Sequence, residues 1–184
     1  VDPRLPGGTY DLTLSLVDPE TGERRGRATV IQEDLAMEMP PRLFTKPDME
    51  TVVDARFGDV LHLLGYNARS EDDTLMIGLY WQALRRMDES FKFFVHLYDR
   101  ETGEIVAQQD AVPQDWTYPT DWWEAGEIVR DDARLSLQSL SSDGYQLAVG
   151  IYDPETGERL PIMTDSSAAS VDDRRLFLTK DGLP

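Results

Sequence analysis

Asp153-Pro154-Glu155-Thr156-Gly157-Glu158 is the third copy of one turn sequence in this chain. The earlier copies are Asp18-Pro19-Glu20-Thr21-Gly22-Glu23 and Asp99-Arg100-Glu101-Thr102-Gly103-Glu104. In each copy the first Asp can accept hydrogen bonds from the backbone of the turn, and the Gly supplies the positive φ that closes a type I turn with a G1 bulge. Each copy joins two runs in which apolar and polar residues alternate, so the turns predict β-hairpins.

Alternating patterns extend over most of the chain. Residues 10–16 alternate strictly and are predicted to form a half-buried strand that pairs with residues 26–32. Further strands are expected at residues 60–66, 75–82, 91–98, 105–109, 127–137, 145–152 and 175–179. The run at residues 91–98 is apolar on both faces, which indicates a central strand. Only residues 49–56 and 83–89 show helix potential.

This number of short strands with turns between them favours an all-β fold. We predict an antiparallel two-sheet β-sandwich, immunoglobulin-like or jelly-roll-like, with an extra N-terminal hairpin. The predicted core consists of Phe57, Leu64, Ile77, Leu79, Trp81, Phe93, Val95, Leu97, Leu147, Val149 and Ile151.

An internal repeat suggests how the chain is divided. Residues 8–17, before the first turn, parallel residues 143–152, before the third, and in both a Gly and a Tyr open the strand. We therefore interpret residues 1–33 as a hairpin that ends a preceding repeat, residues 34–50 as a connector, and residues 51–180 as the sandwich domain. The apolar face of this hairpin is expected to be covered, either by the sandwich or by a second molecule.

Composition limits the classes of partner. Acidic residues outnumber basic ones 35 to 18, which gives a formal net charge of −17. Such a surface repels phosphate backbones and anionic lipid headgroups, so neither nucleic acid nor direct membrane insertion of this chain is expected. The sequence contains no cysteine, which excludes disulfides and thiolate chemistry. No apolar stretch approaches the roughly 18 residues of a membrane span.

Motifs of catalysis and of metal binding are missing from the sequence. It has no Gly-x-Ser-x-Gly elbow, no phosphate-binding glycine loop and no dinucleotide fingerprint, so we expect no enzyme activity and no catalytic residues. A carboxylate pair for glycoside hydrolysis is the less favoured alternative, because its separation is a three-dimensional quantity. His62 and His96 lie on predicted strands among apolar neighbours and are interpreted as structural. No cofactor or metal site is predicted; the acidic clusters at residues 71–73, 131–132 and 172–173 make calcium the alternative to solvated turns.

One loop concentrates aromatic residues. Residues 113–123 contain three of the four tryptophans and a tyrosine, interspersed with carboxylates. Pyranose C–H faces stack on flat rings while acidic side chains accept hydrogen bonds from hydroxyl groups. The competing interpretation is that these rings pack across the loop and that Trp123 plugs the end of the sandwich. The candidate sugar-binding residues are Trp116, Tyr118 and Trp122, with Asp115 and Asp121 as acceptors.

Several motifs follow one another in a characteristic order. They are Leu79-Tyr80-Trp81-Gln82-Ala83, Phe94-Val95-His96-Leu97-Tyr98-Asp99, Gln108-Gln109-Asp110-Ala111-Val112-Pro113, Tyr118-Pro119-Thr120, Trp123-Glu124-Ala125-Gly126-Glu127-Ile128-Val129-Arg130-Asp131 and Tyr145-Gln146-Leu147-Ala148-Val149-Gly150-Ile151-Tyr152-Asp153. Over about residues 57–162 this pattern resembles the non-catalytic extracytoplasmic β-domain found C-terminal to multispanning glycosyltransferases of the dolichyl-phosphate-mannose mannosyltransferase type in Chloroflexi and related bacteria.

The resemblance implies an accessory module of a membrane-bound glycosyltransferase, acting as a spacer or as a surface that contacts a glycan or another acceptor. It implies an extracytoplasmic location, a tether to the membrane through a segment outside this sequence, and the parent membrane domain as a partner in cis. The alternative is a carbohydrate-binding module of a secreted protein.

Overall fold

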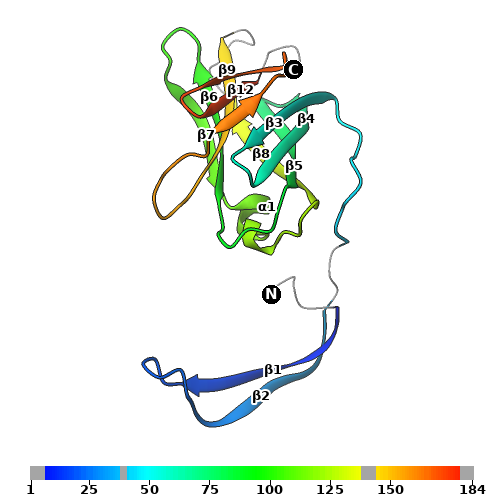
Figure 1. Ribbon diagram of the computed structural model, residues 1–184, viewed down its shortest axis with the longest axis vertical. Coiled ribbons are helices and arrows are strands. Elements are labelled where there is room, and N and C mark those ends of the chain that lie inside the picture. The colour runs from blue at the N-terminus through cyan, green and yellow to red at the C-terminus, as the bar shows by residue number, and fades with distance from the viewer. Residues whose placement is uncertain (1–6, 38–40, 138–143, 179–184) are drawn as a thin grey trace. The chain divides into compact units, whose positions relative to one another are not determined.

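The computed structural model describes residues 7–37, 41–137 and 144–178, and these residues are almost entirely β (Figure 1). The chain divides into two compact units, Val1–Pro41 and Arg42–Pro184. The first unit contains β1 (Gly8–Val17) and β2 (Arg24–Met37), which pair antiparallel around the first turn. β2 continues past the predicted strand end at residue 32 and past the predicted hairpin boundary at residue 33, because Met37 pairs with Gly8 at the start of β1.

The second unit contains two five-stranded antiparallel sheets. The first sheet has the order β10-β3-β4-β5-β8, and the second has the order β11-β12-β9-β6-β7. The strands of the first sheet are β3 (Thr51–Phe57), β4 (Leu61–Glu71), β5 (Thr74–Ala83), β8 (Ile128–Ser136) and β10 (Ile162–Thr164). Those of the second are β6 (Lys92–Asp99), β7 (Ile105–Ala111), β9 (Tyr145–Tyr152), β11 (Ala169–Asp172) and β12 (Arg175–Leu178). This arrangement confirms the predicted all-β fold with two antiparallel sheets and an N-terminal hairpin.

The three repeated turns have the predicted geometry. In the third, Asp153 Oδ1 accepts a hydrogen bond from the Glu155 N–H at 2.8 Å, and the Gly157 N–H donates to the Asp153 carbonyl at 2.8 Å. The glycines that close the turns, Gly22, Gly103 and Gly157, have φ of 71°, 73° and 73°. A left-handed residue is required there, and glycine adopts it without steric cost.

Side chains of both sheets meet in one core. The indole of Trp81 lies at its centre, 5.0 Å from the Phe57 ring and 4.7 Å from the Phe93 ring, centroid to centroid. Every residue of the predicted core is buried. Leu64 differs in one respect, since it packs with Tyr80 in a separate small cluster. The cause is a register shift between Leu63 and Gly65, which interrupts the alternation along β4.

β6 is buried on both faces, as predicted. On its outer face Phe94 lies over Gly150 of β9, where an added Cβ would come within 2.1 Å of the ring. Arg159 covers Phe94 at 5.1 Å, and Arg175 covers Tyr98 at 5.6 Å. The outer face of this sheet is therefore closed by stacked guanidinium groups and aromatic rings.

Three sequence expectations are corrected by the structure. Residues 49–56 were expected to have helix potential, but Thr51–Phe57 form β3, with Val53, Ala55 and Phe57 buried at period two. Residues 83–89 form no helix: Ala83 is the last residue of β5, and the residues after it are bends and irregular backbone. The short edge strands β10 and β11 were not predicted. Residue 179, the expected end of the last strand, lies outside the described residues.

Candidate functional site

The loop between β7 and β8 carries all the predicted site residues. It contains two short elements, α1 (Pro113–Trp116) and the 3-10 turn Thr120–Trp122. The loop begins directly after β7, which ends at Ala111, and runs into β8, which begins at Ile128. Its two halves are held in different ways.

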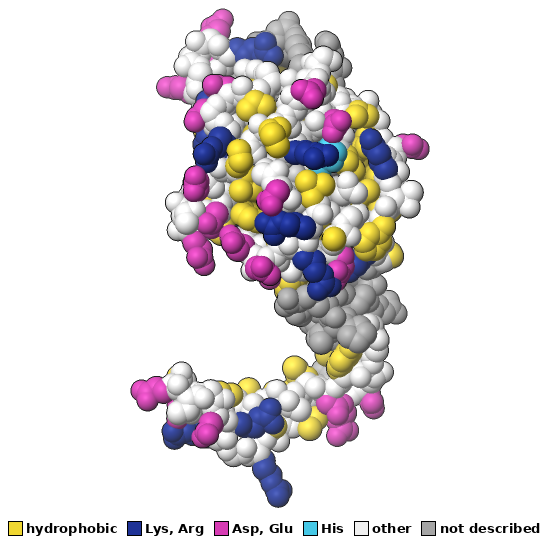
Figure 2. Space-filling model, viewed as in Figure 1, with side chains coloured by type: hydrophobic (Ala, Val, Ile, Leu, Met, Phe, Trp, Pro, Cys, Tyr) yellow, Lys and Arg dark blue, Asp and Glu magenta, His cyan; other side chains and the backbone are white. Residues whose placement is uncertain are grey.

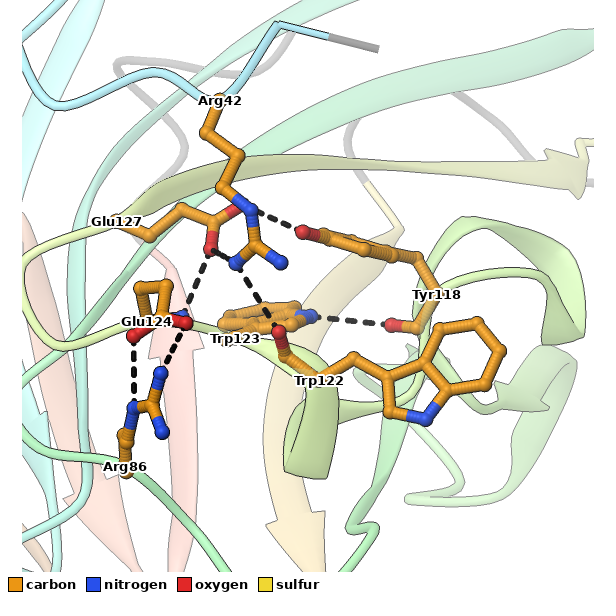
Figure 3. Close-up of polar contacts among 7 residues, drawn as sticks. All are labelled: Arg42, Arg86, Tyr118, Trp122, Trp123, Glu124 and Glu127. Atoms are coloured by element: carbon orange, nitrogen blue, oxygen red, sulfur yellow. Dashed lines mark hydrogen bonds and ion pairs between the residues drawn. The ribbon is translucent and has the colours of Figure 1, made fainter. Parts of the chain in front are cut away.

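The second half of the loop is fixed by Glu127, whose side chain is buried. Its carboxylate accepts hydrogen bonds from Arg42 Nη1 at 2.6 Å, from the Tyr118 hydroxyl at 2.7 Å and from the Glu124 N–H at 2.8 Å (Figure 3). Arg42 also donates to the Trp122 carbonyl at 3.1 Å. A buried carboxylate needs such donors, and here they tie the start of the unit to the loop. Burial and the hydrogen bond to Glu127 raise the pKa of Tyr118 far above its usual value.

Trp123 closes the end of the core, as in the interpretation that competes with sugar binding. Its Nε1–H donates to the Tyr118 carbonyl at 3.1 Å, and its ring stacks on the Tyr118 ring at 6.2 Å (Figure 3). Trp122 meets the Tyr118 ring edge-on at 6.5 Å. Next to it, Arg86 pairs with Glu124, and this hydrogen bond lowers the pKa of Glu124. Tyr118 and Trp122 thus belong to a network that holds the loop together.

The first half of the loop has an unusual backbone. Gln114, Asp115 and Trp116 have φ of 53°, 52° and 69°, so three consecutive residues other than glycine are left-handed. Each such residue costs about 1 to 2 kcal/mol relative to the right-handed conformation. Backbone hydrogen bonds close the turn, from Trp116 N–H to the Val112 carbonyl at 3.0 Å and from Tyr118 N–H to the Pro113 carbonyl at 3.1 Å. Residues held in such sparsely populated conformations cluster at active sites and ligand-binding segments.

β8 anchors this turn through Gln114. The Gln114 N–H donates to Asp131 Oδ1 at 2.7 Å, and its side-chain amide donates to the Arg130 carbonyl at 3.3 Å. Asp131 points inward on β8 and is only 7% exposed. Its burial raises the pKa of the carboxyl to about 6, and the nearby Asp132 and Asp115 carboxylates act in the same direction. The bond from Gln114 opposes the effect of burial without cancelling it.

The turn presents its side chains outward. Trp116 is 57% exposed, and the Lys92 ammonium lies 4.6 Å from the centre of its ring. A shallow depression beside the turn is lined by Gln114, Asp115, Arg130 and Asp132. The depression therefore combines an amide, carboxylates and a guanidinium, and it adjoins a turn that carries a flat exposed ring. These are the groups with which proteins bind saccharides.

The predicted site residues are thus distributed over two places. Asp115 and Trp116 lie together on the left-handed turn, whereas Tyr118 and Trp122 lie in the Glu127 network. Asp121 is half-buried in the 3-10 turn, and its Oδ1 is buried without a hydrogen-bond partner among the described residues.

Sequence reasoning missed the contributions of Gln114, Arg130 and Asp132. The alternation along β8 was the available signal, because it places Arg130 and Asp132 outward and Asp131 inward. Their proximity to the turn depends on the tertiary fold and is not visible in the sequence pattern.

The two histidines pair with carboxylates. His62 Nε2 lies 2.6 Å from Asp54 Oδ1, and His96 Nε2 lies 2.9 Å from Asp110 Oδ2. Within residues 7–37, 41–137 and 144–178, no three His, Asp or Glu side chains are gathered in a way that could hold a metal ion. In the same described ranges, no helix has the length and apolar character needed to cross a membrane.

The chain matches no known protein-family model and no curated protein sequence.

Proposed function

We propose that this chain is a non-catalytic accessory β-sandwich module that contacts glycans through the left-handed turn carrying Trp116. The observation that carries the proposal is an exposed indole on three consecutive left-handed residues. A loop that merely connected β7 to β8 would have no need of this strain. The adjacent Asp115, Gln114 and Arg130 supply acceptors and donors for hydroxyl groups.

The order of the sequence motifs suggests which kind of protein contains this module. We propose that the module belongs to the extracytoplasmic part of a membrane-bound glycosyltransferase, with the membrane domain in cis and glycan or acceptor as the molecule contacted. A carbohydrate-binding module of a secreted protein would use the same surface. The complete reading frame separates the two, since several apolar spans support the first and a hydrolase domain behind a signal peptide supports the second.

A glycoside-active enzyme is favoured by one observation, the raised pKa of Asp131. Against it, Asp131 is 7% exposed and its Oδ1 already accepts the Gln114 N–H. A general acid must reach the glycosidic oxygen, so the geometry favours a positioning role for Asp131.

The proposal is tested by isothermal titration calorimetry with mannose-, glucose- and galactose-based oligosaccharides. Binding by the parent chain and its loss in Trp116→Ala are expected. Met163→Ala is the matched control, because Met163 is a similarly exposed apolar side chain (64%) on β10. Absence of binding to every oligosaccharide, or unchanged binding in Trp116→Ala, would overturn glycan contact through this turn.

A further inference from the structure

The outer face of the first sheet contains a groove that is distinct from the Trp116 turn. It has a volume of about 320 Å³ and crosses β4, β5 and β8. The register places Arg69, Met76 and Arg134 in one row across the three strands, and Asn67, Gly78 and Asp132 in the next row. Gly78 forms the floor. A Cβ at this position would come within 2.8 Å of Asp132 Oδ1 and within 2.9 Å of Arg130 Nε.

Most polar groups along this groove already have partners. Arg130 Nε donates to Asp132 Oδ1 at 2.8 Å, and Glu50 Oε2 accepts the Ala68 N–H at 3.1 Å. Asn67 accepts the Glu50 N–H at 2.8 Å. These contacts fix the walls of the groove and neutralise Arg130.

Two guanidinium groups in the groove, those of Arg69 and Arg134, differ from these paired groups. Among the described residues, Arg69 and Arg134 make no hydrogen bond or ion pair through their side chains. Acidic residues outnumber basic ones nearly two to one in this chain, and most arginines of the sandwich are paired with a carboxylate. Both signs of charge are interspersed on the face drawn in Figure 2. Two unpaired guanidiniums that line one groove are therefore a local exception to the charge of the chain.

The spacing of these two arginines suits one oxyanion. They flank Met76 from the two neighbouring strands, so their Cα atoms are about 10 Å apart across the sheet. Long side chains from this separation can converge on a single carboxylate or sulfate, and a guanidinium binds such groups through paired N–H donors. The half-buried Met76 between them offers an apolar surface to the C–H face of a sugar ring.

We propose that this groove binds the anionic group of an acidic saccharide, with Arg69 and Arg134 as its ligands. The oxyanion site follows from the two arginines alone, whereas the choice of a saccharide as carrier rests on the proposed function. Arg130 and Asp132 line both this groove and the depression beside the Trp116 turn, so the two surfaces adjoin.

Calorimetry at low ionic strength tests the proposal with three probes: tri-galacturonate, neutral maltotriose and sodium sulfate. Tri-galacturonate is expected to bind, and Arg69→Gln/Arg134→Gln should weaken it about tenfold or more, as expected for the loss of charge-assisted hydrogen bonds. Arg56→Gln is the matched control, since Arg56 is exposed on β3 of the same sheet. Melting temperatures verify that each variant is folded.

The outcomes separate this proposal from the previous one. Weakening in the double arginine variant with no effect of Arg56→Gln supports the groove, whatever Trp116→Ala does. Unchanged tri-galacturonate binding in the double arginine variant, or no binding of that probe at all, overturns it. Sodium sulfate binding as tightly as tri-galacturonate would show a free-oxyanion site and overturn the saccharide assignment. The proposed function fails separately, when Trp116→Ala leaves oligosaccharide binding unchanged.

Discussion

Asp131→Asn is expected to stabilise the protein at neutral pH, because Asp131 is ionised there at a cost in free energy. Burial raises the pKa of Asp131 from 3.8 to about 6 in the folded state. A carboxyl with a raised pKa favours folding most when it is protonated. The contribution of protonated Asp131 to folding stability is fully present below about pH 4, and it is lost as the pH rises through about 6. At about 1.4 kcal/mol per pH unit, the difference between the two pKa values corresponds to about 3 kcal/mol above pH 6.

Asparagine removes the charge and keeps the shape. Its Oδ1 can still accept the Gln114 N–H, now as a weaker neutral hydrogen bond. We therefore expect the free energy of unfolding to rise by about 1 to 3 kcal/mol near pH 8 and to change little near pH 4. The left-handed turn should persist, so the glycan binding proposed for Trp116 should be retained.

The assay is urea denaturation followed by tryptophan fluorescence at several pH values between about 4 and 8. Asp88→Asn is the control, because Asp88 is exposed and its substitution removes one negative charge without changing a buried group. The quantity compared is the difference in the free energy of unfolding between Asp131→Asn and Asp88→Asn. Both variants lose one negative charge, so the effect of net charge on stability cancels in this difference. Equal stability of Asp131→Asn and Asp88→Asn near pH 8 would refute the reasoning.

Three further substitutions test other parts of the structure. Asp115→Gly should stabilise by up to about 1 kcal/mol in thermal melts, because glycine relieves a left-handed residue, and should weaken oligosaccharide binding in calorimetry; a destabilised variant would show that the turn is unstrained. Val149→Ala should cost about 1 to 3 kcal/mol in urea denaturation, since Val149 is fully buried, and a loss below about 0.5 kcal/mol would contradict the packing. Gly157→Ala should cost about 1 kcal/mol through backbone strain alone, because no atom lies within 4 Å of the added Cβ, and an unchanged melting temperature would contradict the turn assignment.

The sequence predicted those parts of the fold whose causes are local. Repeated turns and period-two alternation were sufficient to predict the hairpins, the two-sheet architecture and a core around Trp81. They were insufficient for β3, whose pairing with β4 has a register shift between Val52 and Ala55, next to the left-handed Asp54. The very short strands β10 and β11 contain too few residues to show a period. β10 pairs with β3, which is distant in sequence, whereas β11 forms a tight hairpin with β12.

The candidate site was less accessible to sequence reasoning. Aromatic density drew attention to this loop, and the expected burial of Trp123 in the core is observed. It did not reveal that Tyr118 would donate to the buried Glu127, a carboxylate that also accepts a hydrogen bond from Arg42, 85 residues earlier in the chain. The left-handed conformation of Gln114, Asp115 and Trp116 also has no glycine or asparagine to signal it. Its cause is tertiary, since Asp131 holds the Gln114 N–H.

Each of the two proposed binding surfaces lacks a local interaction or conformation that would stabilise the fold. Each residue of the left-handed turn costs about 1 to 2 kcal/mol of stability, and the groove contains two guanidinium groups without the ion pairs that most arginines of the sandwich form. Both exceptions to local stability lie beside the Arg130–Asp132 pair, which lines each depression. An acidic oligosaccharide long enough to reach both surfaces would bind the second as an intramolecular step, and so more tightly than either surface binds a short fragment. Affinity that rises steeply with chain length is therefore the behaviour expected of two adjoining sites, whereas two unrelated surface features would give no such dependence.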